Sequence, residues 1–108
     1  MSEGARFVSL KAVTAIGNGE RCDLGHPLQK HTLQVVITGD PTQVKVLLVG
    51  SLDGTNFATM ATWDTATGDV SGGMLSVSDA PMSWLRADLD TLTAGTSPTV
   101  TAIIASSP

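Results

Sequence analysis

Two aliphatic runs separated by a short polar turn constrain the fold of this chain more than any other feature of its sequence. Residues 33–38 and 44–49 are both rich in β-branched side chains, which favour extended strands. Between them, residues 39–42 (Gly-Asp-Pro-Thr) interrupt helix and strand alike. Proline fixes its own φ, aspartate bonds to nearby backbone, and glycine tolerates positive φ. The pattern predicts a β-hairpin.

Segment 83–90 gives the clearest strand signal outside that hairpin. Its aliphatic residues at 85, 87 and 89 share one face, and the alternate positions are Trp84, Arg86, Asp88 and Asp90. A period of two with charges on one side indicates a strand that has one face in the core and one face toward water or a partner.

Several other segments also have strand patterns. Residues 7–16 fit a helical spacing as well, but β-branched residues within them and the glycines that follow favour a strand. In the strand expected at 57–63, Phe57, Thr59, Ala61 and Trp63 should share a face. Further short strands are expected at 74–78 and 99–105.

About seven short strands, no convincing helix, and none of the crossover segments that parallel strands require predict an all-β fold. The expected architecture is an antiparallel two-sheet β-sandwich, Ig-like or jelly-roll-like. Residues 95–100 repeat the glycine, Pro-Thr and valine arrangement of residues 39–44, which we interpret as the same turn chemistry used twice rather than an internal repeat.

Two connections stand out by length. Residues 17–30 concentrate glycine, proline and charge, so we expect a short extended piece at 22–24 and a crossing from one sheet to the other. Residues 64–73 are the most loop-like segment and are predicted to form a mobile tip. The Asp53-Gly54 pair predicts a tight turn.

Length and charge exclude several classes of protein. A chain of 108 residues supports one core, so residues 1–108 are predicted to be a single domain with a short N-terminal arm over about residues 1–5. The net charge of −4 and six scattered cations argue against nucleic-acid binding. Cys22 is the one cysteine, so no intrachain disulfide is possible. No apolar run approaches the ~20 residues of a membrane helix.

No arrangement of reactive residues indicates catalysis. Cys22, His26 and His31 lack the fourth ligand and the spacing of a structural zinc site, so solvated loop residues are expected there. The run from Asp64 to Asp69 resembles part of a calcium loop but lacks its bidentate glutamate. Asp88 and Asp90 are better explained as a solvated strand face than as a glycosidase pair. We expect no enzymatic activity, metal or cofactor.

The two tryptophans are the side chains most suited to recognition. Trp63 is expected to cover the core. Trp84 shares its strand face with Arg86, and tryptophan and arginine are the residue types that dominate binding hot spots, so a partner-facing role is as well supported there as a structural one.

The ordered motifs resemble a family of small all-β structural proteins of tailed bacteriophages. Residues 46–57 (VLLVGSLDGTNF) are similar to a V-x-L-x-G-S-L-D-G-T-x-[WF] stretch, and residues 85–101 (LRADLDTLTAGTSPTVT) are similar to its V/L-R-A-x-L-x-x-L-T-x-G-T-x-P-T-V-T ending. Phe57 replaces a frequent tryptophan and Ala94 a frequent glycine. The resemblance covers about residues 32–105.

The resemblance implies a capsid decoration (cement) protein that stabilises contacts between capsomers on the outside of the virion after synthesis in the host cytoplasm. The implied partner is the major capsid protein, and closed symmetry favours a homotrimer. The expected interface residues are Ser2, Glu3 and Arg6 near the N-terminal arm, with Trp84 and Arg86. A head or tail appendage, or a carbohydrate-binding or host-adhesion module, remains the alternative.

Overall fold

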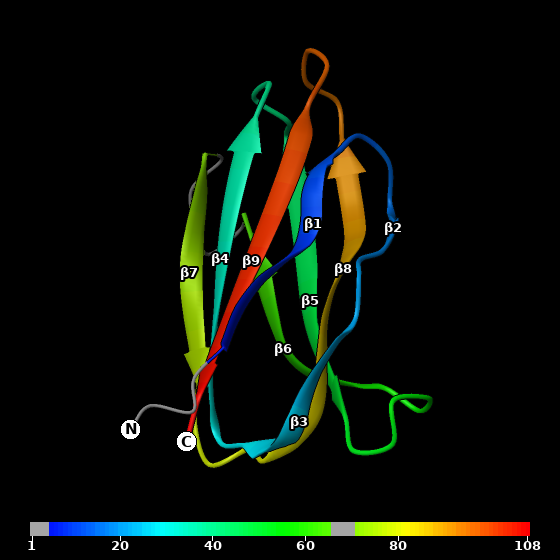
Figure 1. Ribbon diagram of the computed structural model, residues 1–108. Helices are drawn as coiled ribbons and strands as arrows, with labels where there is room; N and C mark the ends of the chain where they lie inside the picture. Colours follow the sequence, from blue (N-terminus) through cyan, green and yellow to red (C-terminus); the bar gives the residue numbers. More distant parts are fainter. Residues whose placement is uncertain (1–4, 66–70) are drawn as a thin grey trace.

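The structure, a computed structural model, describes residues 5–65 and 71–108, apart from the side chain of His26. Within these residues the chain forms nine β-strands, and it contains no helix long and apolar enough to span a membrane. The strands are β1 (Ala5–Val13), β2 (Gly17–Asn18), β3 (Cys22–Leu28), β4 (Lys30–Thr38), β5 (Gln43–Ser51), β6 (Ala58–Asp64), β7 (Gly72–Val77), β8 (Met82–Thr93) and β9 (Thr99–Ser107) (Figure 1).

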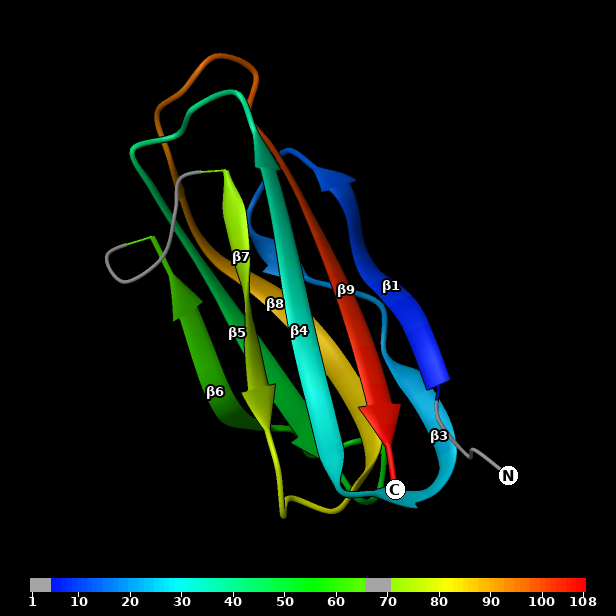
Figure 2. The same ribbon diagram turned by 90° about the vertical axis from the view of Figure 1, so that its left-hand side faces the viewer.

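The strands form two antiparallel sheets that pack face to face. Sheet A has the order β1-β9-β4-β7, and sheet B has the order β2-β8-β5-β6 with β3 also paired to β8. Figure 2 shows the two layers, with β7, β4, β9 and β1 in one and β6, β5 and β8 in the other. The predicted β-sandwich is therefore confirmed, with nine strands in place of about seven.

Alternating aliphatic side chains from both sheets fill the space between the layers. The predicted inward positions of β8 are buried, as are the inward positions of β4, β5 and β9. Trp63 is 5% exposed and belongs to this core, which confirms the position expected for it. The sandwich is thus stabilised by apolar burial, because no disulfide is available.

The prediction of a β-hairpin around residues 39–42 is wrong. β4 lies in sheet A and β5 in sheet B, so the connection between them is an arch from one layer to the other. The β8–β9 connection is a second such arch beside it: the Gly39 carbonyl accepts a 2.8 Å hydrogen bond from the Thr96 amide. A Cβ on Gly39 would lie 2.6 Å from Pro98 Cα. The turn chemistry shared by the two segments therefore serves two neighbouring arches.

The prediction that Phe57, Thr59, Ala61 and Trp63 share one face holds only for Ala61 and Trp63, which both pack in the core. The register between β5 and β6 shifts at Met60, because Leu48 pairs with Ala61 while Val49 pairs with Thr59. Met60 is thus the extra residue of a β-bulge, and it packs against the core. Thr59 consequently does not share the inward face of Trp63.

The long connection at 17–30 does cross between sheets, as expected, since β1 lies in sheet A while β2 and β3 lie in sheet B. It contributes two strands rather than one short extended piece. The middle of the predicted mobile tip at 64–73, residues 66–70, lies outside the described residues, while β6 extends to Asp64 and β7 begins at Gly72.

Candidate functional site

The outer face of sheet B gathers arginine and aromatic side chains from three separate parts of the chain. We call Arg21, Phe57, Trp84, Arg86 and Asp88 the arginine–aromatic surface. Arg86 donates to both carboxylate oxygens of Asp88, at 2.7 Å from Nε and 3.0 Å from Nη2. Its guanidinium also lies 4.4 Å from the centre of the Phe57 ring. The Asp88 carboxylate and the Phe57 ring therefore hold the planar guanidinium group of Arg86 in one orientation.

Trp84 is held in a similar way by Arg21, which immediately precedes β3, and by the loop between β5 and β6. The Arg21 guanidinium lies 5.3 Å from the centre of the Trp84 ring, and Arg21 Nη1 donates to the Gly54 carbonyl at 2.5 Å. A Cβ on Gly54 would approach Trp84 Cε2 to 2.6 Å, and the φ of Gly54 is +78°. Glycine is required at this position both for its conformation and for the close approach of the ring.

Asp53 fixes the shape of the same loop. Its carboxylate accepts hydrogen bonds of 2.8 Å from the amides of Thr55 and Asn56, from the Asn56 side chain and from the Ser51 hydroxyl. The Asn56 backbone amide contributes most to holding the pKa of Asp53 well below its ordinary value, followed by the Asn56 side chain and the Thr55 amide. The ionised carboxylate thus positions Gly54 against Trp84.

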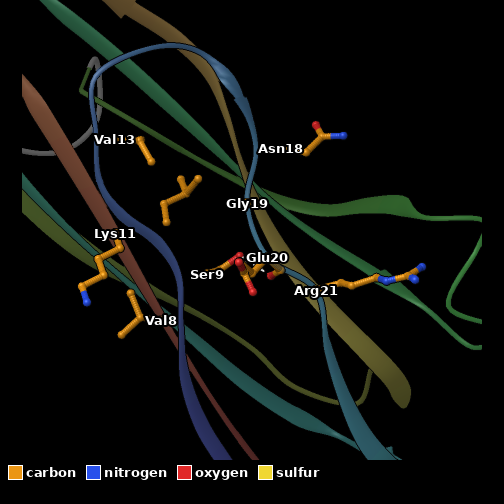
Figure 3. Close-up of a pocket in the computed structure, with 9 residues that line it drawn as sticks. Val8, Ser9, Lys11, Val13, Asn18, Gly19, Glu20 and Arg21 are labelled. Atoms are coloured by element: carbon orange, nitrogen blue, oxygen red, sulfur yellow. Dashed lines mark hydrogen bonds between the residues drawn. The ribbon is translucent and has the colours of Figure 1, made fainter.

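A separate pocket of about 730 Å³ lies between β1 and the β2–β3 segment (Figure 3). The Ser9 hydroxyl at its base already bonds to backbone groups of Glu20 and Ala87. The Lys11 and Arg21 side chains extend in opposite directions, as Figure 3 shows. No aromatic residue lines the pocket. The pocket therefore lacks the convergent polar groups and the aromatic platform of a small-molecule site.

His31 does not lie in a solvated loop, contrary to expectation. It is 1% exposed, its Nε2 donates to the Ala80 carbonyl at 2.9 Å, and its Nδ1 lies 2.8 Å from Ser106 Oγ. Burial raises the pKa of the Cys22 thiol, with a smaller contribution from the charge of Asp23. Among the described residues no group of three His, Cys, Asp or Glu side chains could hold a metal ion. His31 thus has a structural role, because both of its ring nitrogens are engaged within the fold and neither is available as a base or a metal ligand.

The two carboxylates of β8 have separate partners. Asp88 is bound by Arg86, whereas Asp90 Oδ2 accepts a 3.2 Å hydrogen bond from the Thr91 hydroxyl. Two carboxyl groups engaged in this way do not resemble the general acid and nucleophile that flank a glycosidic bond.

Of the five predicted interface residues, the structure describes Arg6, Trp84 and Arg86, and these three lie on two different sheets. Ser2 and Glu3 lie outside the described residues. Arg6 is exposed on β1 in sheet A, whereas Trp84 and Arg86 lie on the outer face of sheet B.

Sequence reasoning missed Arg21 and Phe57, which complete the arginine–aromatic surface. Arg21 comes from the residues just before β3 and Phe57 from the loop before β6, both far from β8 in sequence. The Asp53-Gly54 pair was the one signal that pointed toward this loop.

Comparison with known proteins supports the fold and leaves the family open. No protein-family model matches the chain, and no curated protein matches it significantly. Among solved structures, the SPBc2 prophage-derived protein YomS is similar at a TM-score of 0.64 and 16% identity. The match covers 100% of this chain and 96% of that one.

Two other solved structures come from carbohydrate-active proteins. The CBM32 of AlyQ, solved with 4,5-unsaturated mannuronic acid, has a TM-score of 0.58 and 14% identity, and the match covers 94% of this chain and 75% of that one. A family 89 glycoside hydrolase from Clostridium perfringens has a TM-score of 0.59 and 15% identity over 92% of this chain but only 14% of the hydrolase. Similarity at these identities establishes a shared fold.

Proposed function

We propose that this chain is a non-enzymatic structural protein of a tailed-bacteriophage particle, and that it decorates the outer surface of the capsid. The observation that carries the proposal is the match to a prophage-derived protein over essentially the full length of both chains. The β-sandwich formed by the described residues suits a decoration protein, because it offers rigid outer faces for contact with a shell. The resemblance of residues 32–105 to phage virion proteins supports the same role.

The chemistry of the described side chains fits a binding role better than catalysis. Both ring nitrogens of His31 are engaged, and the pKa of Cys22 is raised, so neither supplies an activated base or nucleophile. The arginine–aromatic surface instead presents tryptophan and arginine side chains held in fixed orientations. Tryptophan and arginine dominate binding hot spots, and side chains that are already fixed lose less conformational entropy on association.

The major capsid protein is the proposed partner, and the arginine–aromatic surface is the proposed contact. Many equivalent copies on a shell stabilise it through summed contacts, even where each contact is weak. The test is the copy number in purified particles, measured as band intensity against the major capsid protein. Hundreds of copies support decoration, whereas a low, ring-like copy number supports a head or tail appendage. Absence from the particle refutes both.

A variant test then addresses the surface itself. Arg86→Ala removes the contacts to Phe57 and Asp88, and we expect capsid binding to weaken by about tenfold or more, as for a hot-spot residue. Thr62→Ala is the matched control, because Thr62 is exposed on β6 in the same sheet. Equal binding by both variants, with circular dichroism showing intact folds, would contradict the proposed contact.

A carbohydrate-binding module is the second candidate, favoured by the similarity to the CBM32 of AlyQ. Against it, the Trp84 and Phe57 rings each have a guanidinium stacked over them. A sugar would have to displace an arginine to stack on the same face of either ring. Titration with unsaturated mannuronic acid oligosaccharides decides the matter: saturable quenching of tryptophan emission that disappears in Trp84→Phe would favour the carbohydrate role.

A further inference from the structure

Among the described strands, three of the four sheet edges carry features that prevent another strand from pairing with them. The β1 edge has Arg6, Lys11 and two shifts of register against β9. The β6 edge is interrupted by the bulge at Met60. At the other edge of sheet B, β2 has two residues, and β3 contains Pro27 and an irregular register against β8. Charges, bulges, proline and short length are the means by which proteins block an edge.

The fourth edge, β7, has neither a charge, a proline nor a bulge. Its six residues read Gly-Gly-Met-Leu-Ser-Val. All six pair with β4 in one continuous register, from Val36–Gly72 to His31–Val77. In Figure 1, β7 lies at the left margin of its layer with β4 beside it. β7 is therefore the regular, uncharged edge of the sandwich.

The direction of the backbone hydrogen-bonding groups of β7 follows from one bond at its start. The Ile37 amide donates to the Ser71 carbonyl at 3.0 Å, and bonded and non-bonded pairs alternate along an antiparallel ladder. Met74 and Ser76 consequently occupy non-bonded pairs, in which side chains approach closely, as the 3.1 Å contact between the Thr32 and Ser76 hydroxyls illustrates. The backbone amides and carbonyls of Met74 and Ser76 therefore point away from β4, toward the open edge.

The inward side chains of β7 are incompletely covered. Leu75 and Val77 pack against the core but remain half-buried. Leu33, which pairs with Leu75, is 0% exposed, because β4 has a strand on each side. One more strand beside β7 would cover Leu75 and Val77 in the same way, and it would bond to the backbone groups that Met74 and Ser76 direct outward.

We propose that the β7 edge accepts an extended segment of the major capsid protein as a fifth strand of sheet A, an inference that rests on the function proposed above. The segment has aliphatic side chains at alternate positions, which cover Leu75 and Val77. It is uncharged over the paired residues, because β7 offers no charge to compensate one. Backbone hydrogen bonds supply the affinity of such an added strand, and the alternating side chains supply its specificity.

The β7 edge and the arginine–aromatic surface belong to different sheets. β7 borders sheet A, whereas Trp84 and Arg86 lie on the outer face of sheet B. One copy of the chain would therefore contact the shell at two separate places, which is what stabilising the contact between neighbouring capsomers requires.

A second copy of this chain fits the β7 edge less well. Centred on Met74, antiparallel pairing of β7 with itself sets Gly73 against Leu75. Centred on Leu75, it sets Gly73 against Val77, so in each case one inward aliphatic side chain gains no side chain over it. Shifted by one more residue, the pairing overlaps only residues 75–77. A foreign strand with a side chain at every position avoids both restrictions.

Met74→Pro tests the edge while keeping the ladder to β4. Proline lacks the outward N–H and its ring occupies the edge, and proline is tolerated on edge strands where the N–H faces outward. The preceding residue is Gly73, which has no Cβ to clash with the proline ring. We expect binding of the full chain to purified capsids that lack it to weaken by about tenfold or more, because the partner loses a hydrogen bond and its close approach.

Met74→Ala is the matched control, because it shortens the same side chain and keeps the N–H. It should bind capsids within about threefold of the unmodified chain, with circular dichroism showing both variants folded. Equal binding by Met74→Pro and Met74→Ala would overturn the inference and leave the proposed function standing. No capsid binding by the unmodified chain would refute the proposed function together with the partner assigned to this edge.

Hydrogen exchange on the unmodified chain gives a second measurement that needs no variant to fold. In the free chain the amides of Met74 and Ser76 should exchange much faster than that of Leu75, which bonds to β4, and they should become protected on capsids. No gain of protection on capsids would refute the added strand. Protection of Met74 in the free chain, together with a sedimentation mass of twice 11.1 kDa, would assign the edge to a second copy and overturn the proposal.

Discussion

Ser9 Oγ accepts a 2.8 Å hydrogen bond from the backbone amide of Ala87, 78 positions further along the chain. The same hydroxyl donates to the Glu20 carbonyl at 2.7 Å, and Ser9 is only 3% exposed. The register of β1 against β9 shifts between Val8 and Leu10, so Ser9 lies at the irregularity. One side chain thus joins an edge strand of sheet A to an inner strand of sheet B.

Ser9→Ala should lower the free energy of unfolding by about 1–3 kcal/mol, because the substitution leaves the buried Ala87 amide and the Glu20 carbonyl without this partner. Urea denaturation followed by circular dichroism measures the change. Ser76→Ala is the control: its hydroxyl bonds to Thr32 on the exposed face, and its removal should change stability by less than about 0.5 kcal/mol. Equal effects would show that Ser9 is not a structural link.

His31→Leu should destabilise the fold by about 2 kcal/mol, since it removes the partner of the buried Ser106 hydroxyl and of the partly buried Ala80 carbonyl. A double-mutant cycle with Ser106→Ala, measured by urea denaturation, isolates the direct contact. We expect a coupling energy above about 0.5 kcal/mol. Additive effects would mean that the 2.8 Å contact contributes nothing of its own.

Gly54→Ala should destabilise the fold more than Gly25→Ala. Both glycines have positive φ, +78° and +83°, so both variants bear a similar backbone strain of about 1 kcal/mol. Only Gly54 has a neighbour in the way, since its Cβ would overlap the Trp84 ring, whereas Gly25 has open space. Thermal unfolding compares the variants, and Trp84 emission should shift to the red in Gly54→Ala alone. Equal melting temperatures would exclude the steric contribution.

The carboxyl of Asp53 should titrate below the ordinary aspartate value of about 3.9. Because the folded pKa is lowered, the stability that the loop gains from this carboxylate is present above the ordinary pKa. That stability is lost as pH falls through the lowered value. Carbon-13 NMR of the carboxyl group measures the midpoint directly.

Asn56→Ala provides the control for this titration. It removes the side-chain donor but keeps the backbone amides of Thr55 and Asn56, so the midpoint should rise without reaching the ordinary value. A midpoint at the ordinary value in the unmodified protein would contradict the hydrogen-bonded geometry of the loop.

Local periodicity determined the class of the fold. The strict alternation of residues 83–90 identified which side chains of β8 are buried, because successive strand residues point to opposite faces whatever the partner strand is. Trp84 and Arg86 were assigned correctly to the outward face for that reason. The enrichment in β-branched and aliphatic residues also identified β4, β5 and β9 as strands, without assigning their faces.

Pairing between strands was decided only by the tertiary structure. Residues 39–42 have the same turn chemistry in a hairpin as in an arch, and what selects the arch is that β4 and β5 bury their inward faces against each other across the core. The bulge at Met60, the burial of His31 and the stacking of Arg21 on Trp84 are likewise contacts between distant segments. A sequence encodes such contacts jointly over the whole chain, so no local pattern of residues specifies them.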